Sequence, residues 1–225
     1  MSKNALVKEI FTSIQGEGPY VGANQLFIRF SGCNLKCAYC DTEHEVEATC
    51  YTPMTLKSEI EKQPLAKIHS ISLTGGEPLL HAGFLAEFLP LCENKIYLET
   101  NGTLLEPFSE IAKFVDFVSM DIKLNSVSNQ GDFFITHDKF IELAKHHNVE
   151  TFVKVVFDNS ITDEEIKTTS EICKKHGVLL VLQPMMSDYH LSVSGSELIS
   201  IYQKFLNHYS NVRVIPQMHK FLHVE

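Results

Sequence analysis

Short apolar runs rich in β-branched and aromatic residues recur along the chain and alternate with helix-type patterns. The runs predict strands at 25–30, 69–73, 95–98, 117–120, 151–157, 178–182 and 212–215. Helices are predicted between most of them, at 55–63, 79–92, 107–114, 138–147, 163–176 and 197–209. The helix at 163–176 is the best marked, because Thr162 and Glu165 form a capping box and Gly177 follows its last turn. This alternation predicts βα units and a parallel sheet.

Polar motifs follow the predicted strands. S-G-C follows the first strand, T-G-G-E-P the second, E-T-N-G the third, D-I-K the fourth, Q-P-M-M the sixth and P-Q-M-H-K the seventh. The carboxyl ends of parallel strands meet at one mouth of a β/α barrel. With about seven strands, we expect an α/β fold with an incomplete, TIM-like barrel and an active site at its C-terminal mouth. The segment at 124–134 is predicted to be a loop or a mobile lid.

Composition narrows the setting. With 225 residues, of which 44% are hydrophobic, the chain is expected to form a single domain over 1–225. Its 19 basic and 28 acidic residues give a net charge of −9, which argues against a nucleic-acid surface and favours a small-molecule partner. The first residues lack the apolar core of a signal peptide, and no apolar run approaches the roughly 20 residues of a membrane span. We therefore expect a cytoplasmic protein without a membrane partner.

Three of the six cysteines, Cys33, Cys37 and Cys40, form a C-x-x-x-C-x-x-C triplet. Thiolates suit iron–sulfur clusters or zinc. Three of them can hold three irons of a 4Fe–4S cubane and leave the fourth iron open for chemistry. A structural zinc site with His44 as the fourth ligand is the alternative that spacing leaves open. The isolated cysteines are expected to be small buried hydrophobes: Cys50, Cys92 and Cys173.

The triplet has an aromatic residue, Tyr39, before its last cysteine, and T-G-G-E-P follows the next predicted strand. In this the chain resembles the radical S-adenosylmethionine (radical SAM) superfamily. The resemblance implies that S-adenosylmethionine chelates the open iron and is cleaved by one electron to methionine and a 5′-deoxyadenosyl radical. Gly75 and Gly76 would let the backbone approach a ligand, and Glu77 would accept from an amine.

The likeness extends over nearly the whole chain to one family, the 7-carboxy-7-deazaguanine synthases. It is carried by I-Q-G-E-G, C-D-T, E-T-N-G, D-I-K, L-Q-P-M and the closing Q-M-H-K-F-L-H-V-E. It implies a lyase of queuosine and 7-deazapurine biosynthesis that contracts 6-carboxy-5,6,7,8-tetrahydropterin to 7-carboxy-7-deazaguanine plus ammonia, with Mg²⁺. It also implies a homodimer and an electron donor such as flavodoxin or ferredoxin. The cofactor would carry the radical chemistry, so no catalytic side chain is assigned.

The resemblance also assigns residues to the substrate and to Mg²⁺. Arg29 stands in the apolar stretch F-I-R-F and would pair with the substrate carboxylate, which a guanidinium matches bidentately. A charge at a strand edge or an internal ion pair is the alternative for Arg29. Thr42 resembles the Mg²⁺ ligand, although from the residues alone it reads as a turn residue. For Glu225, the last residue, a frayed tail is the alternative to a substrate contact. The remaining substrate contacts would be Ile14, Gln15, Gly16, Thr74 and Glu225.

A third set of residues matches positions that hold S-adenosylmethionine. Glu77 and Glu99 are added to it as amine and ribose acceptors. The chain departs from many relatives in two places, because it reads D-I-K for Ser-Pro-Lys and has Met186 where some carry an acid. Asp188 is the acid that could take over the second contact. The matching residues are Gly76, Asp121, Ile122, Lys123, Gln183, Pro184, Met185 and Met186.

Two other functions remain in view. A glycyl-radical activase shares the cysteine spacing and a similar size, but it needs a protein partner and has no use for a pterin-binding Q-G-E-G loop. A zinc-stapled binding module is colourless and holds no iron, so absorption of the anaerobically purified protein separates it from an iron–sulfur enzyme.

Overall fold

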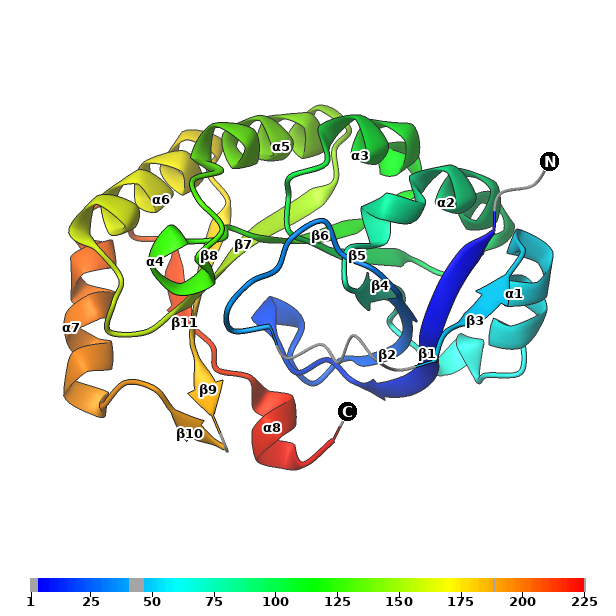
Figure 1. Cartoon of the computed structure of the whole chain (residues 1–225), viewed down its shortest axis with the longest axis horizontal. Coiled ribbons are helices and arrows are strands. Elements are labelled where there is room, and N and C mark those ends of the chain that lie inside the picture. The colour runs from blue at the N-terminus through cyan, green and yellow to red at the C-terminus, as the bar shows by residue number, and fades with distance from the viewer. Residues whose placement is uncertain (1–3, 41–46, 188, 225) are drawn as a thin grey trace.

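The computed structural model describes residues 4–40, 47–187 and 189–224 (Figure 1). In these residues nine strands form one sheet, in the order β11-β8-β7-β6-β5-β4-β2-β1-β3. Seven of them run parallel and coincide with the seven predicted strands to within two residues at either end. These are β2 (Asn24–Phe30), β4 (Ser70–Gly75), β5 (Ile96–Thr100), β6 (Phe117–Asp121), β7 (Glu150–Phe157), β8 (Leu179–Pro184) and β11 (Val212–Val214).

The sheet curves into an incomplete barrel, as the sequence predicts. Its edge strands, β11 and β3 (Thr49–Tyr51), are not hydrogen-bonded to each other, so the barrel stays open. A separate pair, β9 (Met186–Ser187) and β10 (His190–Leu191), follows β8. No helix in the described part of the chain is long and apolar enough to span a bilayer.

Helices cover the outer face of the sheet and form an arc in Figure 1. They bury the apolar side chains of the strands in one large core. The helix predicted at 79–92 is broken into η3 (Pro78–His81), α2 (Ala82–Phe88) and η4 (Leu89–Leu91), with a proline at the start of each 3₁₀ turn. The remaining helices of the arc are α1 (Pro53–Ile60), α3 (Leu105–Ile111), extended by η5 (Ala112–Phe114), α5 (Phe134–His146), α6 (Asp163–His176) and α7 (Gly195–Leu206).

Two expectations need correction, and one strand was not predicted. The segment at 124–134 is not a free loop, because it contains the helix α4 (Asn125–Ser128), and Leu124, Val127 and Ser128 are buried. A strand that the sequence analysis missed, β1 (Ala5–Ile14), pairs antiparallel with β2. Cys50 is exposed on the edge strand β3 and is not a buried hydrophobe, whereas Cys173 is fully buried.

The connection from β1 to β2 closes the amino-terminal end of the barrel. It contains η1 (Gly18–Tyr20), which lies inside the ring of strands in Figure 1. The ring of Tyr20 meets those of Tyr97, Phe117 and Phe152, which form a small apolar cluster on the inner face of the sheet. This plug fills the bottom of the barrel and leaves the carboxyl ends of the strands open.

Candidate active site

A cavity of about 570 Å³ lies inside the barrel, above the β1–β2 connection. Residues from the inner strands, the cysteine loop and the segment after β11 line it. The fold therefore brings together most side chains that the sequence singled out. The predicted site residues that line the cavity are Ile14, Gln15, Gly16, Arg29, Cys33, Cys37, Cys40, Thr74, Gly76, Glu99, Asp121, Lys123, Gln183, Met185 and Met186.

The cysteine triplet lies directly after β2, and all three thiols border the cavity. Two main-chain N–H groups tie the loop to the end of α4 and the residues that follow it. Lys36 N–H donates to Gln130 Oε1 (3.0 Å), and Ala38 N–H donates to the Ser128 carbonyl at the end of α4 (3.0 Å). Burial raises the pKa of the Cys33 and Cys37 thiols, so a bound metal must displace their protons.

The glycine pair at the end of β4 allows two turns to touch. Gly75 has φ +124°, a region that residues with a side chain rarely adopt. A Cβ on Gly76 would lie 1.9 Å from the Gly32 carbonyl oxygen and 3.1 Å from Cys33 Cβ. Only glycine therefore lets the T-G-G-E-P turn pack against the start of the cysteine loop.

Glu77 does not line the cavity. It is fully buried behind the cavity wall, and its carboxylate accepts hydrogen bonds from Leu79 N–H (3.0 Å), Asn101 N–H (2.8 Å) and the Thr100 hydroxyl (2.9 Å). Burial raises its pKa to about 7. Glu77 thus joins the end of β4 to the end of β5, and its contact with a cofactor amine stays a prediction. Two further residues assigned to the cofactor are buried and do not line the cavity, namely Ile122 and Pro184.

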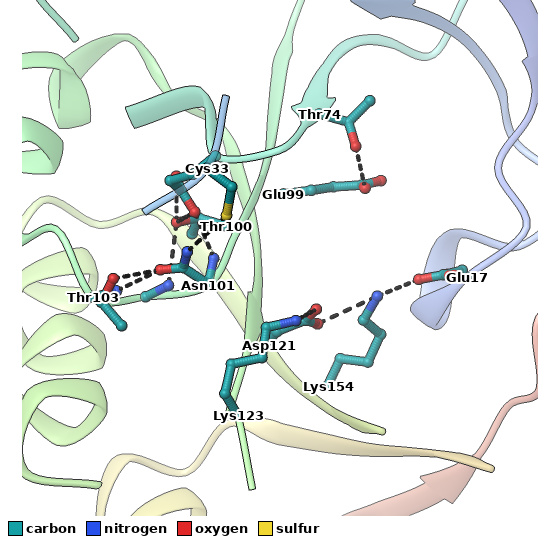
Figure 2. Close-up of polar contacts among 12 residues, drawn as sticks. Glu17, Cys33, Thr74, Glu99, Thr100, Asn101, Thr103, Asp121, Lys123 and Lys154 are labelled. Atoms are coloured by element: carbon teal, nitrogen blue, oxygen red, sulfur yellow. Dashed lines mark hydrogen bonds and ion pairs between the residues drawn. The ribbon is translucent and has the colours of Figure 1, made fainter. Parts of the chain in front are cut away.

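A chain of alternating charges crosses the cavity floor (Figure 2). Lys123 Nζ pairs with Asp121 Oδ2 (2.8 Å), Lys154 Nζ lies 3.2 Å from Asp121 Oδ1, and Lys154 also pairs with Glu17. Burial alone disfavours the Lys154 ammonium, but Asp121 and Glu17 outweigh burial and raise its pKa well above the usual value. Burial also opposes ionisation of Glu17, yet Lys154 holds the pKa of Glu17 below its usual value. Lys154 and Glu17 are therefore both charged at neutral pH.

Glu17 and Lys154 are not among the predicted site residues. Lys154 had a signal, because it is the one charged residue in the apolar run T-F-V-K-V-V-F, and a lysine is rarely buried without a partner. Glu17 lies in the I-Q-G-E-G motif, but nothing local shows that its partner lies 137 positions away.

Glu99 lies among the predicted substrate residues. Its carboxylate accepts from Gln15 Nε2 (3.0 Å) and from the Thr74 hydroxyl (2.8 Å; Figure 2), and Gln15 also donates to Gln25 Oε1 (2.9 Å). Burial raises the pKa of Glu99. The carboxylate is thus held by Gln15 and Thr74, so Glu99 is better grouped with them than with a ribose.

Arg29 and the last helix complete the wall. Arg29 Nε donates to Glu9 Oε2 (2.6 Å), and its guanidinium lies over the Phe11 ring at 5.5 Å. This bond uses Nε. A substrate carboxylate would instead be bound by a pair of parallel N–H groups of the same guanidinium. The helix α8 (Met218–Leu222) packs on the β1–β2 connection, where Met218 N–H donates to the Gly16 carbonyl (2.8 Å).

Comparison with known proteins assigns this arrangement to a family. The radical SAM superfamily matches residues 27–178. The 7-carboxy-7-deazaguanine synthase of Geobacter sulfurreducens is 34% identical and aligns over 99% of both chains. That of Archaeoglobus fulgidus is 36% identical, over 96% of this chain and 97% of its own. The chain belongs to the 7-carboxy-7-deazaguanine synthase family. Its members are radical SAM enzymes, so the chain is an enzyme that uses a 4Fe–4S cluster and S-adenosylmethionine.

Two solved structures show the fold of this family member. QueE from Escherichia coli superposes with a TM-score of 0.64 at 18% identity, over 96% of this chain and 95% of its own. Streptococcus suis SuiB, solved with bound S-adenosylmethionine, superposes with a TM-score of 0.62 at 15% identity, over 84% of this chain and 49% of its own. The full-length match to the synthases sets aside the activase and zinc-module alternatives.

The residues of this family member fit both cofactors. Cys33, Cys37 and Cys40 come from one loop and border one cavity, which is a donor set that suits an iron–sulfur cluster. Gln183 lines the same cavity at 2% exposure, and its Oε1 has no hydrogen-bond partner within the described residues. A buried acceptor left in this state can accept a hydrogen bond from a ligand in the cavity.

The departures from the family pattern have different outcomes. In D-I-K, Asp121 is held between Lys123 and Lys154, so its carboxylate is part of the charge chain. Met186 is buried and lines the cavity, whereas Asp188 lies outside the described residues. Thr42, His44 and Glu225 also lie outside them. In the part of the chain that is described, no group of three His, Cys, Asp or Glu side chains is arranged around a single ion, whereas the thiolates of a cubane bind separate irons.

Proposed function

We propose that the chain contracts 6-carboxy-5,6,7,8-tetrahydropterin to 7-carboxy-7-deazaguanine with release of ammonia. The observation that carries the proposal is the composition of the cavity. The cysteine loop follows the carboxyl end of β2, and the Q-G-E side of the wall comes from the connection at the other end of that strand. When bound, the cluster and S-adenosylmethionine supply the hydrogen-abstracting chemistry. The chain's own residues hold the pterin between these two sides.

The polar wall suits a flat heterocycle with a carboxylate. Arg29 offers two parallel N–H groups to the carboxylate while Glu9 holds its Nε. Gln15, Glu17 and Glu99 offer acceptors and donors to the edge of the ring. Lys154 Nζ stays protonated at neutral pH, because the carboxylates around it outweigh burial and raise its pKa. Ile14, Gly16 and Thr74 complete this side of the cavity.

S-adenosylmethionine would lie against the cysteine side. Gly76 lines the cavity beside the cysteine loop, and Gln183 offers its unsatisfied Oε1. Asp121 and Lys123 provide fixed charges beside them. The apolar contacts would come from Met185 and Met186.

Other parts of the proposal rest on the family alone. Mg²⁺, held in part by Thr42, would bind the substrate carboxylate, and Glu225 would contact the substrate. We further propose a homodimer that receives electrons from a flavodoxin or a ferredoxin.

The test is an anaerobic assay of the reconstituted protein with the carboxy-tetrahydropterin, S-adenosylmethionine, Mg²⁺ and dithionite, with the product identified by mass spectrometry. We expect one ammonia for each 7-carboxy-7-deazaguanine. Cys37→Ala serves as the control and should bind less iron and form no product. An active Cys37→Ala protein, or cleavage of S-adenosylmethionine without pterin turnover in the parent, would contradict the proposal.

A further inference from the structure

Asn101, at the carboxyl end of β5, has its main chain fixed from two sides. Its N–H donates to Glu77 Oε2 (2.8 Å), and its carbonyl accepts from Nε2 of the fully buried His137 (3.0 Å). Only 6% of Asn101 is exposed. The position of its Cα is thus determined by two buried side chains, one from the T-G-G-E-P turn and one from α5.

The side chain of Asn101 is held as firmly. Its Oδ1 accepts from the N–H and the hydroxyl of Thr103 (3.1 and 2.5 Å). Its Nδ2 donates to Asn34 Oδ1 (2.9 Å), and Asn34 Nδ2 donates back to the Thr103 hydroxyl (2.8 Å; Figure 2 shows Asn101 and Thr103). Rotating the carboxamide by 180° would set its NH₂ group against two donors of Thr103 and its oxygen against Asn34 Oδ1. The NH₂ group therefore has one orientation.

That orientation aims the second hydrogen of Nδ2 at the cysteine loop. Nδ2 lies 4.0 Å from Cys33 Sγ, within the range of a hydrogen bond to sulfur. Cys33 Sγ also accepts from Leu35 N–H at 3.4 Å. A donor aimed at a ligating sulfur stabilises the more negative, reduced state of a cluster, which is one of the means by which proteins set reduction potentials.

We propose that Asn101 is a positioning residue for the 4Fe–4S cluster: it fixes the Cys33–Asn34 segment and donates an N–H to the Cys33 sulfur, which raises the reduction potential. The role acts through Cys33 and needs no contact with the pterin. It rests on the cluster and is independent of the ring-contraction reaction.

The experiment is a redox titration monitored by electron paramagnetic resonance, at fixed pH and without pterin or S-adenosylmethionine. The parent is compared with Asn101→Ala, which removes every side-chain bond without adding charge, and with Asn101→Asp, which keeps the oxygen that Thr103 needs but replaces the N–H donor by a negatively charged oxygen. The control is Gln130→Ala, which frees the same loop at Lys36 by removing two bonds but touches no sulfur. Iron and sulfide are determined in every protein.

We expect four irons per chain in all four proteins and a more negative midpoint potential in both Asn101 variants. A tenfold lower ratio of reduced to oxidised cluster at a fixed potential corresponds to about 59 mV for one electron. Gln130→Ala should keep the parent's potential. Unchanged potentials in the Asn101 variants, or an equal shift in Gln130→Ala, would overturn the proposal. So would loss of the cluster from both Asn101 variants, because the residue would then be purely structural. A parent without a 4Fe–4S signal would instead refute the cluster itself.

Discussion

Lys154 neutralises two partly buried carboxylates at the cavity floor, those of Glu17 and Asp121. Replacing it by Met would leave Glu17 and Asp121 partly buried without their cation. Removing one partner of a buried ion pair costs about 3 kcal/mol, and the partial exposure of these carboxylates places the cost at the low end. We therefore expect Lys154→Met to lower the free energy of unfolding at pH 7 by roughly 2 to 3 kcal/mol, measured by urea denaturation.

The loss should shrink at pH 5, because burial without Lys154 raises the pKa of Glu17 and lets it take up a proton. Lys175→Met provides the control, since Lys175 pairs with Asp138 on the exposed surface. Its change should be small at both pH values. Equal losses in the two variants would show that the charge chain is no more important than a surface pair.

Arg29 tests how the substrate acid is recognised. Arg29→Lys keeps the charge but loses the planar fork, so we expect substrate binding to weaken by roughly 1 to 3 kcal/mol, measured as KM for the pterin. Reductive cleavage of S-adenosylmethionine without substrate should persist. If both activities disappear together, Arg29 is a structural residue.

At the scale of elements, α5 holds the β5 turn through a group that titrates. Burial lowers the pKa of His137 to about 4, so the folded protein keeps this ring neutral while the unfolded chain binds a proton below pH 6.5. Stability from this group is therefore present above pH 6.5 and is lost as the pH falls towards about 4. Between these two pH values the contribution of His137 to the free energy of unfolding falls by about 3 kcal/mol. The curves of unfolding free energy against pH for the parent and His137→Gln should converge by this amount, and parallel curves would contradict the assignment.

The first turn of α6 also holds α4 in place. Glu165 completes the capping box with Thr162, and its Oε1 also accepts from Ser126 N–H of α4 (2.9 Å). Thr162→Ala should cost about 1 kcal/mol of unfolding free energy. Glu165→Ala should cost more, because it also leaves the α4 donor unpaired. Glu197→Ala, at the matching position of α7, is the control, because its further bond, from the Asn159 side chain, is exposed and its loss leaves no buried donor unpaired. We expect a smaller loss from it in the same denaturation assay, and equal losses would exclude a role for the α4 contact.

The elements that could be predicted are those whose signal is local. The strands at 25–30 and 151–157 are apolar because helices and the barrel interior bury both faces, and the capping box at Thr162 marks α6 at its first residue. β1 escaped prediction because its burial is irregular and its pairing shifts register between Val7 and Glu9. The same holds for the site. The motifs at the strand ends predicted the residues around the cavity, but no local signal predicted that Lys154 is the partner of Glu17.

At the scale of the whole molecule, the β1–β2 connection and the segment after β11 are in contact at the cavity floor. Gln217 Nε2 donates to Glu17 Oε1 (2.8 Å), and a Cβ on Gly16 would lie 2.4 Å from the His219 ring. We expect a chain ending at Pro216 to keep its iron content but to form no product, because the floor loses this support. Iron analysis and product assay would check this, and turnover at the parent's rate would contradict it.

The contact between Gln217 and Glu17 also sets an order of events during synthesis. Its two residues are 200 positions apart, so the ribosome makes the second roughly 10 to 40 s after the first. For most of that interval the cysteine loop has been made while α8 does not yet exist. The barrel thus passes through a stage in which its thiols are made and its floor lacks its final cover, and this is the period in which an assembly factor has the widest access to load iron and sulfide.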